Sequence, residues 1–333
     1  MRDHLYEIGE VAAMIKRGDG LLLAGDEGLL RQLPRGNWIG GTIPYFMNRD
    51  GGVVDHKRIF VNDLPFGLSC RGVRQYGESG IERVYSDLPS DGFGVVIMPA
   101  TSPVHLAFAL GAPNFDQFAL RPLVGWVSGV HLEDLETKAP LVFDGTTGEA
   151  LGDKAVVMHV ALPRGKVAEL GVLNIFRTGT GPSITFPSSG FSATEVEVDG
   201  KRQNFAQYIK KAGLDTKLPL VADYCGTPIN VSYQAIDDEN GQVFFYAPVF
   251  AGVAYRHAAP VGDYVTEFTS HMPKDLDQRV AFSCNCILNY LFAGLEGKKT
   301  GSVACPITFG EIAYQLLNQT LAYITIDDVK SAS

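Results

Sequence analysis

The segment Val280–Leu288, VAFSCNCIL, decides how the second half of the chain is interpreted. Residues 278–283 predict a strand, and the apolar residues that follow from Ile287 to Leu295 repeat with helical spacing up to Gly297. Cys284 and Cys286 would then lie where a strand passes into a helix. Such a pair could be metal ligands, a redox pair, a nucleophile with its neighbour, or two small buried side chains.

The residues around this pair argue against a metal and a disulfide. A closed zinc site needs further ligands, and Cys225, Cys305 and His257 show no C-x-x-C or H-x-x-H spacing. A disulfide across one intervening residue would be strained, so we expect no metal, no cofactor and no disulfide here. N–H groups at a helix start would favour a Cys284 thiolate, which leaves open a nucleophile with His257 as its best base. The alternative is a packed strand–helix corner, which we favour for Cys286.

Outward from this segment, apolar runs separated by glycine, proline and polar turns predict an α/β fold with mixed or antiparallel sheets covered by helices. The hairpin prediction is the sharpest, because two alternating strands flank Asp238–Gly241 and Asn-Gly is a strong turn signal. A change in character near residues 195–203 suggests two parts, 1–200 and 201–333. Further elements are expected as strands at 21–24, 92–100, 123–132 and 154–162 and as helices at 6–16 and 204–213.

Two segments of the chain, residues 21–46 and 280–315, follow the same order of elements. Each has an apolar strand, small or polar residues, a short helix, a loop and a strand ending in Gly-x-Ile. In an alignment of the two segments, Gly41-Thr42-Ile43 would correspond to Gly310-Glu311-Ile312, and Asp26 would lie near the position of Cys284. We therefore expect a duplication, with two similar halves about a pseudo-twofold axis, layered as αββα in one arrangement. The two Gly-x-Ile strands should lie near the shared interface.

Polar residues inside apolar strands are the candidates for ligand binding. Glu311 lies in the apolar segment CPITFGEIAY, where a carboxylate must be paired, hydrogen-bonded or in a cavity, and Gly310 permits close approach. Arg256 lies among Val, Ala and Tyr, where it would either hold an anion or pair with Glu311. A glutamate facing water and turn chemistry at Asn318 are the plain alternatives.

The motifs VAFSCNCI, PITFGEIAYQ and LNQTLAYITI resemble, in this order, the C-terminal half of the FIST family, which are sensory domains of prokaryotic signalling proteins. The likeness rests on Cys284, Gly310-Glu311-Ile312 and Asn318-Gln319-Thr320, and WIGGTIPYF (38–46) is similar to a glycine-containing strand of the N-terminal half. The Cys-x-Gly-Arg-Gly turn of that family is replaced here by Cys284–Leu288. The resemblance implies two FIST-like halves that bind a small ligand and pass a signal to a protein partner.

Composition narrows the class of protein further. The 333 residues are 46% hydrophobic with a net charge of −9 and no basic block, so nucleic acid is a poor partner. No apolar run approaches a membrane span, the N-terminus does not resemble a signal peptide, and the five cysteines suggest reduced thiols in the cytoplasm. The oligomeric state is not specified.

We therefore expect a cytoplasmic small-molecule-binding protein of the sensory type, with an amino acid or organic acid bound between its halves. The alternatives are a cysteine-dependent hydrolase or transferase, and a scaffold without a pocket. The expected ligand-binding residues are Trp38, Gly40, Gly41, Thr42, Arg256, Cys284, Asn285, Gly310, Glu311 and Asn318.

Overall fold

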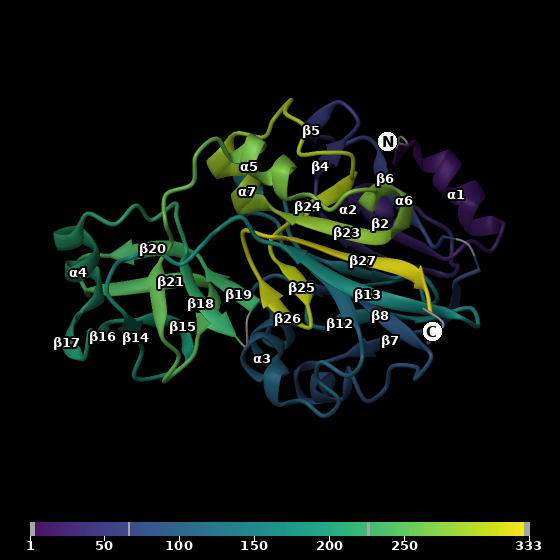
Figure 1. Cartoon of the computed structure of the whole chain (residues 1–333). Coiled ribbons are helices and arrows are strands. Elements are labelled where there is room, and N and C mark those ends of the chain that lie inside the picture. The colour runs from purple at the N-terminus through teal and green to yellow at the C-terminus, as the bar shows by residue number, and fades with distance from the viewer. Residues whose placement is uncertain (1–3, 66, 225–226, 330–333) are drawn as a thin grey trace.

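The computed structural model describes residues 4–65, 67–224 and 227–329, and in these ranges the chain forms a main body and a smaller module (Figure 1). The body contains three six-stranded sheets, and residues 184–257 form the module. The sheets are mixed or antiparallel and are covered by helices. The predicted α/β class is thus confirmed.

The first sheet of the body contains the strand predicted at 21–24. Its strands β2 and β3 are parallel and are joined by the short helix α2 (Glu27–Leu30). Helix α1 (Ile8–Lys16) covers the outer face, where its buried residues Val11 and Ile15 join the same core cluster as Trp38. The strands in spatial order are β1 (Leu5–Tyr6), β6 (Ile59–Asp63), β2 (Leu21–Gly25), β3 (Trp38–Thr42), β10 (Val142–Asp144) and β11 (Glu149–Leu151).

The central sheet is buried on both faces, which explains its continuous apolar runs. In β8, Val95 and Ile97 face the other two sheets of the body, whereas Val96 and Met98 face helix α3 (Pro103–Gly111) and the 3₁₀ helix η1 (Glu78–Arg83). Two further 3₁₀ turns follow, η2 (Ala112–Asn114) and η3 (Leu132–Asp134). The strands in spatial order are β26 (Gln315–Leu317), β25 (Glu311–Ala313), β9 (Leu123–Ser128), β8 (Gly92–Pro99), β12 (Ala155–Ala161) and β7 (Ser69–Tyr76).

The third sheet carries the segment VAFSCNCIL. Strands β23 and β24 are parallel and are joined by helix α7 (Ile287–Ala293), and α5 (Tyr264–His271) and α6 (Leu276–Arg279) precede β23. The strands in spatial order are β13 (Lys166–Leu173), β27 (Leu321–Asp328), β23 (Val280–Cys286), β24 (Cys305–Thr308), β4 (Tyr45–Asn48) and β5 (Gly51–Val54). Together the layers run helix, first and third sheets, central sheet, helix.

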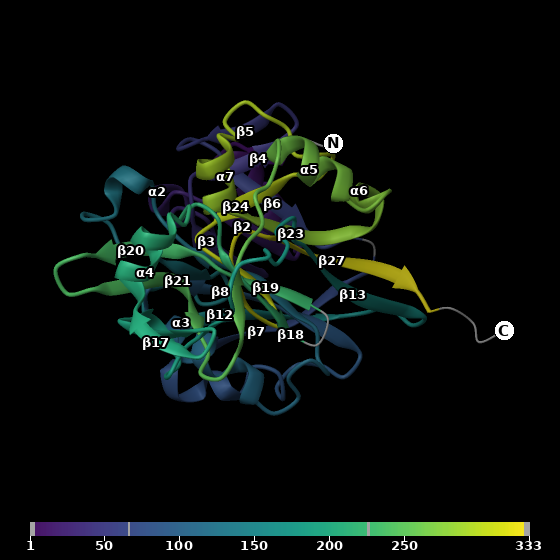
Figure 2. The same ribbon diagram turned by 60° about the vertical axis from the view of Figure 1, so that its left-hand side comes forward.

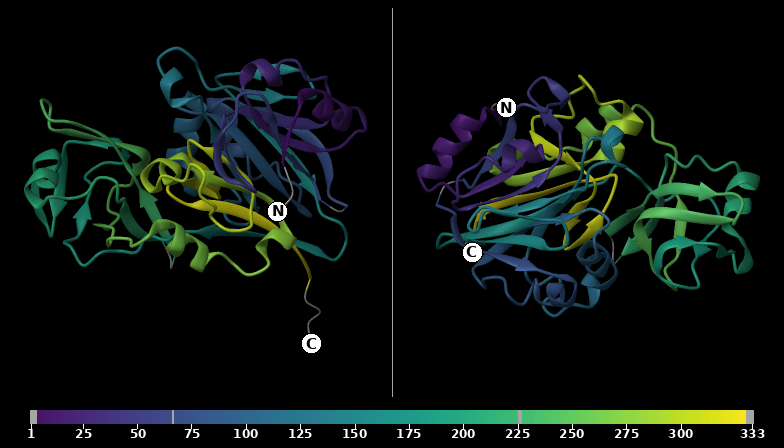
Figure 3. Two further views of the ribbon diagram at one scale, coloured as in Figure 1. Left: turned by 90° about the horizontal axis from the view of Figure 1, so that it is seen from above. Right: turned by 180° about the vertical axis from the view of Figure 1, so that it is seen from behind.

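The module has its own apolar core, in which the rings of Phe186, Phe205 and Phe245 meet edge to face or tilted. Figures 1 and 3 show the module at one end of the molecule, and Figure 2 brings it in front of the body. The predicted hairpin about Asp238–Gly241 is confirmed as β20 and β21. Its elements are β14 (Ile184–Thr185), β15 (Gly190–Ala193), β16 (Glu195–Val198), β17 (Lys201–Asn204), α4 (Phe205–Ala212), β18 (Leu220–Tyr224), β19 (Thr227–Val231), β20 (Tyr233–Asp237), β21 (Gln242–Val249) and β22 (Tyr255–His257).

The strand pairing groups the chain differently from the predicted division at residue 200. That residue lies in the turn between β16 and β17, inside the module. Strands on either side of it pair within the body, namely β9 with β25, β13 with β27 and β4 with β24. The chain therefore builds most of one body, forms the module, and returns to complete the same sheets.

The two segments with a similar order of elements both form parallel strand–helix–strand units, β2–α2–β3 and β23–α7–β24. Their Gly-x-Ile triplets are not equivalent, because Gly41 lies within β3 whereas Gly310 follows β24 and precedes β25. Both triplets nevertheless approach β9, since Val127 N donates to Gly310 O at 2.9 Å and Gly129 N to Thr42 O at 2.8 Å. Duplication stays a prediction.

The cysteine pair lies inside a strand and not at its exit. Strand β23 continues through Cys284 to Cys286, and the helix begins only at Ile287. The transition from strand to helix was expected at Cys284, two residues too early, because pairing with β27 extends the strand to Asn285 and pairing with β24 extends it to Cys286. None of the helices in the described ranges is long and apolar enough to cross a bilayer.

Candidate functional site

Five of the predicted site residues do come together in space, in the interior between the third and central sheets. They are Cys284, Asn285, Gly310, Glu311 and Asn318. Glu311 is fully buried, and its Oε2 accepts hydrogen bonds from the Thr320 hydroxyl at 2.9 Å and the Thr320 backbone N–H at 3.3 Å. Burial raises the pKa of this carboxyl to about 8. Glu311 is therefore mainly the neutral acid at pH 7.

The thiol of Cys284 is not placed to act as a nucleophile. It is fully buried and donates to the Gly125 carbonyl at 3.1 Å. Burial raises the pKa of the thiol well above its ordinary value, and the nearby Glu311 raises it further. The expected lowering by a helix start is absent, because the helix begins at Ile287. The other proposed partner, His257, lies in the module, where its Nε2 contacts Asp215 O at 2.9 Å.

The polar residues beside the cysteines bond to one another and to the module. Asn285 Oδ1 accepts from Cys286 N at 2.8 Å and from Asn289 Nδ2 at 2.9 Å. Asn318 Oδ1 accepts from the hydroxyl of Ser232, which lies in the module, at 2.8 Å. The segments FSCNCIL and FGEI thus meet in a buried polar network, in which the Cys286 thiol is hydrogen-bonded to the Glu311 carboxyl.

The remaining predicted residues lie outside this buried cluster, and of these only Thr42 lines a pocket, which is described below. Trp38 packs on the outer face of the first sheet, and its Nε1 donates to Pro34 O at 2.9 Å. Gly40 and Gly41 serve sheet packing: a Cβ on Gly41 would lie 2.8 Å from side-chain atoms of both Ile97 and Trp126, and one on Gly40 would lie 3.2 Å from Leu23 O.

Arg256 lies in the module and does not reach Glu311. Its guanidinium donates instead to the Gly181 carbonyl. Cys225, considered above as a metal ligand, lies outside the described residues.

Thr42 leads to a pocket of about 290 Å³ at the carboxyl ends of three strands. Asp26 follows β2, Thr42 ends β3, and Gly129–His131 follow β9. β2 runs parallel to β3, and β9 parallel to β8. The carboxyl ends of parallel strands are a recurrent place for ligands, because loops and polar side chains converge there.

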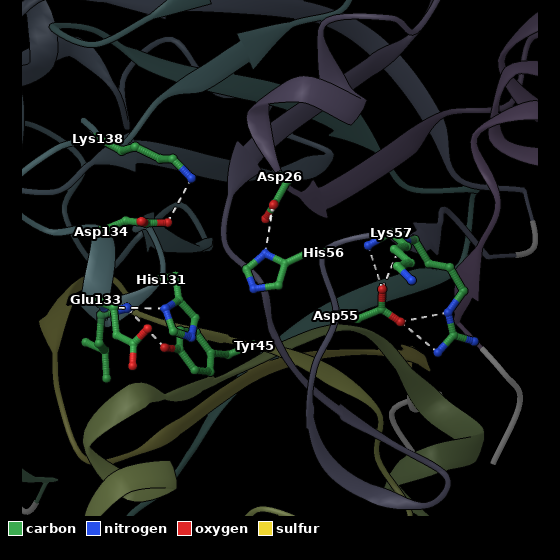
Figure 4. Close-up of polar contacts among 11 residues, drawn as sticks. Asp26, Tyr45, Asp55, His56, Lys57, His131, Glu133, Asp134 and Lys138 are labelled. Carbon is green, nitrogen blue, oxygen red and sulfur yellow. Dashed lines mark hydrogen bonds and ion pairs between the residues drawn. The ribbon is translucent and has the colours of Figure 1, made fainter.

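An aspartate–histidine pair lies in this pocket (Figure 4). Asp26 Oδ2 is 2.8 Å from His56 Nδ1, and the two side chains are 31% and 46% exposed. The turn that carries His56 is held by Asp55, whose carboxylate accepts from the backbone N–H groups of Lys57 and Arg58 at 2.8 and 2.9 Å. Burial acts to raise the pKa of Asp55, but these bonds outweigh it, and the net shift is downward.

A second imidazole, that of His131, lies beside the first. The two ring centroids are 5.3 Å apart. The His131 ring also stacks on Tyr45, with centroids 5.5 Å apart and planes 9° from parallel. The Tyr45 hydroxyl accepts from Leu132 N at 3.1 Å, and His131 Nδ1 accepts from Glu133 N at 3.4 Å. These contacts hold the His131 ring in one orientation.

Two ion pairs complete the pocket lining. Arg31 Nε is 2.7 Å from Glu27, and Lys138 Nζ is 2.8 Å from Asp134. The hydrogen bond from Lys138 keeps the pKa of Asp134 below its ordinary value. Within the described ranges no group of three or more His, Cys, Asp or Glu side chains is placed to hold a metal ion. The pocket thus presents cations and carboxylates in matched pairs.

The sequence interpretation missed Asp26, His56, His131 and Lys138 as site residues. A signal for two of them was present, because Asp26 and His131 closely follow the buried strands LLLAG and LVGWVS. Polar residues at strand ends are candidates for this kind of pocket. No comparable signal marks His56 or Lys138, which lie in loop segments.

Residues 6–327 match the model of a family of unknown function (DUF6976), and the chain belongs to that family. The FIST assignment is therefore wrong, because the match covers nearly the whole chain and is to a different family. Searches of curated proteins and of solved structures each found no match.

Proposed function

We propose that this protein binds a small polar ligand, such as an amino acid or organic acid, in the pocket at the carboxyl ends of β2, β3 and β9. The observation that carries the proposal is the set of opposed charges and two imidazoles around a cavity of about 290 Å³. That volume is near the lower end for small-molecule sites, which favours a ligand with few heavy atoms.

The charge pattern favours a ligand that carries a carboxylate. The Lys138 side chain is 57% exposed, so its ammonium group can turn from Asp134 to an incoming anion at little cost. Arg31, 53% exposed, offers a planar donor pair on the opposite segment. Asp134 would accept from a ligand amine or hydroxyl, whereas Asp26 stays paired with His56.

The signalling role and the cysteine-dependent enzyme are less well supported after these findings. A signalling role was implied by the FIST resemblance and loses its support with it. The cysteine-dependent enzyme is opposed by the burial of Cys284 and the raised pKa of its thiol. A cytoplasmic location remains a prediction, and a scaffold without a ligand is an outcome of the test below.

The test is a calorimetric screen of amino acids and organic acids against the purified chain. Lys138→Gln should weaken any hit about two- to five-fold, since the charge pair that it removes is exposed to solvent. Lys210→Gln is the matched control, because Lys210 forms a similarly exposed ion pair with Asp238 at 2.7 Å in the module. No hit across the panel, or hits weakened equally by both variants, would contradict the proposal.

A further inference from the structure

We propose that the same pocket catalyses proton transfer at the carbon next to the carbonyl group of a small oxo acid, with His56 as the base and His131 as the acid. This inference rests on the proposed function, because the substrate is one of the anions that the pocket would bind. It adds an activity to that binding.

The hydrogen bond from His56 to Asp26 determines which ring nitrogen is free. Asp26 accepts at 2.8 Å from Nδ1, so the proton of the neutral ring lies on Nδ1. The lone pair is then on Nε2, which points away from Asp26 on the side of His131 (Figure 4). A carboxylate in this position orients the ring and stabilises the imidazolium that forms when Nε2 takes a proton.

The bond at His131 determines the opposite tautomer. Its Nδ1 accepts from the backbone N–H of Glu133 at 3.4 Å, so the neutral ring carries its proton on Nε2. One pocket therefore holds a base and a proton donor on rings whose centroids are 5.3 Å apart. Two groups at this short separation can act on neighbouring atoms of one ligand.

Both rings are held before a ligand arrives. His56 is on a turn that is held by hydrogen bonds to the Asp55 carboxylate, and the His131 ring stacks on Tyr45. The lining hydroxyl, that of Thr42, is engaged with the backbone of Leu141, accepting from its N–H at 2.9 Å and donating to its carbonyl at 3.3 Å. Thr42 is thus not poised as a nucleophile, and the imidazoles are the groups prepared for chemistry.

The step balances without a co-reactant. His56 Nε2 takes the proton from the carbon, and the electron pair of that C–H bond forms the C=C bond of an enol. The carbonyl π pair moves to oxygen, which takes the proton from His131 Nε2 and leaves this ring as an imidazolate, whose Nδ1 keeps the hydrogen bond from Glu133 N. Lys138 would hold the substrate carboxylate and so keep the C–H bond near His56. The His56 imidazolium exchanges its proton with solvent. When it then returns a proton to the carbon, the substrate carries a hydrogen from the solvent.

Solvent exchange tests the step without knowledge of the natural substrate. Pyruvate and 2-oxoglutarate are incubated with the protein in D₂O, and loss of the signals from the protons next to the carbonyl is followed by proton NMR. We expect exchange at least about 100-fold above buffer, the range for a positioned acid–base group. His56→Gln and His131→Gln should each remove most of this increase, whereas His271→Gln, an exposed histidine in α5, should leave it unchanged.

Asp26 is a positioning residue, and a separate readout tests its role. Asp26→Asn should lower the exchange rate at saturation at least about 10-fold and leave the half-saturating concentration unchanged. Circular dichroism and melting temperature confirm that each variant is folded. Binding of either acid by calorimetry without exchange above buffer would overturn this inference alone. Absence of binding of any acid would overturn the proposed function as well.

Discussion

The substitution Glu311→Gln should remove a large part of the pH dependence of stability. The wild-type carboxyl is fully buried and has a pKa of about 8, whereas its ordinary value is 4.5. Between these values the folded chain holds a proton that the unfolded chain has lost. The free energy of unfolding therefore falls as pH rises, by about 1.4 kcal/mol for each pH unit. Glutamine has the shape of the neutral acid and does not titrate.

The interval from 4.5 to about 8 corresponds to roughly 5 kcal/mol in total, of which roughly half falls between pH 5 and pH 7. The stabilising contribution of the neutral acid is thus complete below pH 4.5 and is lost progressively towards pH 8. The sign follows from the raised pKa of an acid, whose charged form is disfavoured by burial.

The assay is urea unfolding of wild type and Glu311→Gln at pH 5, 6 and 7, with Glu239→Gln, an exposed glutamate in the module hairpin, as the control. Other groups titrate in the same range, but they cancel in the difference between variants. Glu311→Gln should gain roughly 2–3 kcal/mol relative to wild type from pH 5 to pH 7. An equal pH slope in the two proteins would show that Glu311 is not a buried neutral acid.

Further predictions concern the core and the module. Cys284 should react with iodoacetamide at neutral pH only as fast as the chain unfolds, because its thiol is buried; labelling at the rate of a free thiol would refute that burial. Gly41→Ala should cost about 1–3 kcal/mol by urea unfolding, because its Cβ would lie 2.8 Å from Ile97 and Trp126, whereas Gly9→Ala, with no atom within 4 Å, should be tolerated; similar costs would contradict the close packing of the sheets. Phe205→Ala should cost about 3–5 kcal/mol, detected by hydrogen exchange first in residues 184–257, and a loss of protection confined to the body would argue against a separate module core.

Local patterns predicted local structure well. The alternating residues around Asp238–Gly241 formed the expected hairpin, β20 and β21. These signals involve residues close in the chain, so composition and spacing are enough to reveal them. The strand, short helix and strand expected in residues 21–46 are likewise found as β2, α2 and β3, and the structure shows that the two strands are parallel.

Long-range pairing was beyond such patterns. Strand β13 pairs with β27, and nothing in either strand's own sequence specifies a partner so distant in the chain. The module was therefore missed, and the change in character near residue 200 was interpreted as a boundary although it lies inside the β16–β17 hairpin. Glu311 was correctly singled out as a carboxylate that needs partners, but its partner Thr320 and its full burial depend on the packing of three strands.

The side chains that form the pocket could not be predicted from local patterns either. His56 follows β5 and His131 follows β9, which belong to different sheets, so their rings lie 5.3 Å apart only because the tertiary fold brings these sheets together. Their pairing with Asp26 and Tyr45 is a consequence of the tertiary fold. A single sequence can nominate residues at strand ends, and the sheet order decides which of them share a site.

The most direct test of the account is an NMR titration that follows the histidine ring signals of the intact chain as an acid identified by calorimetry is added. His56 and His131 line the pocket, whereas His105 and His159 are buried elsewhere, at 6% and 7% exposure. We predict saturable shifts of the His56 and His131 signals, with those of His105 and His159 unchanged. Binding that leaves the His56 and His131 signals in place would contradict the central claim that this pocket is the ligand site.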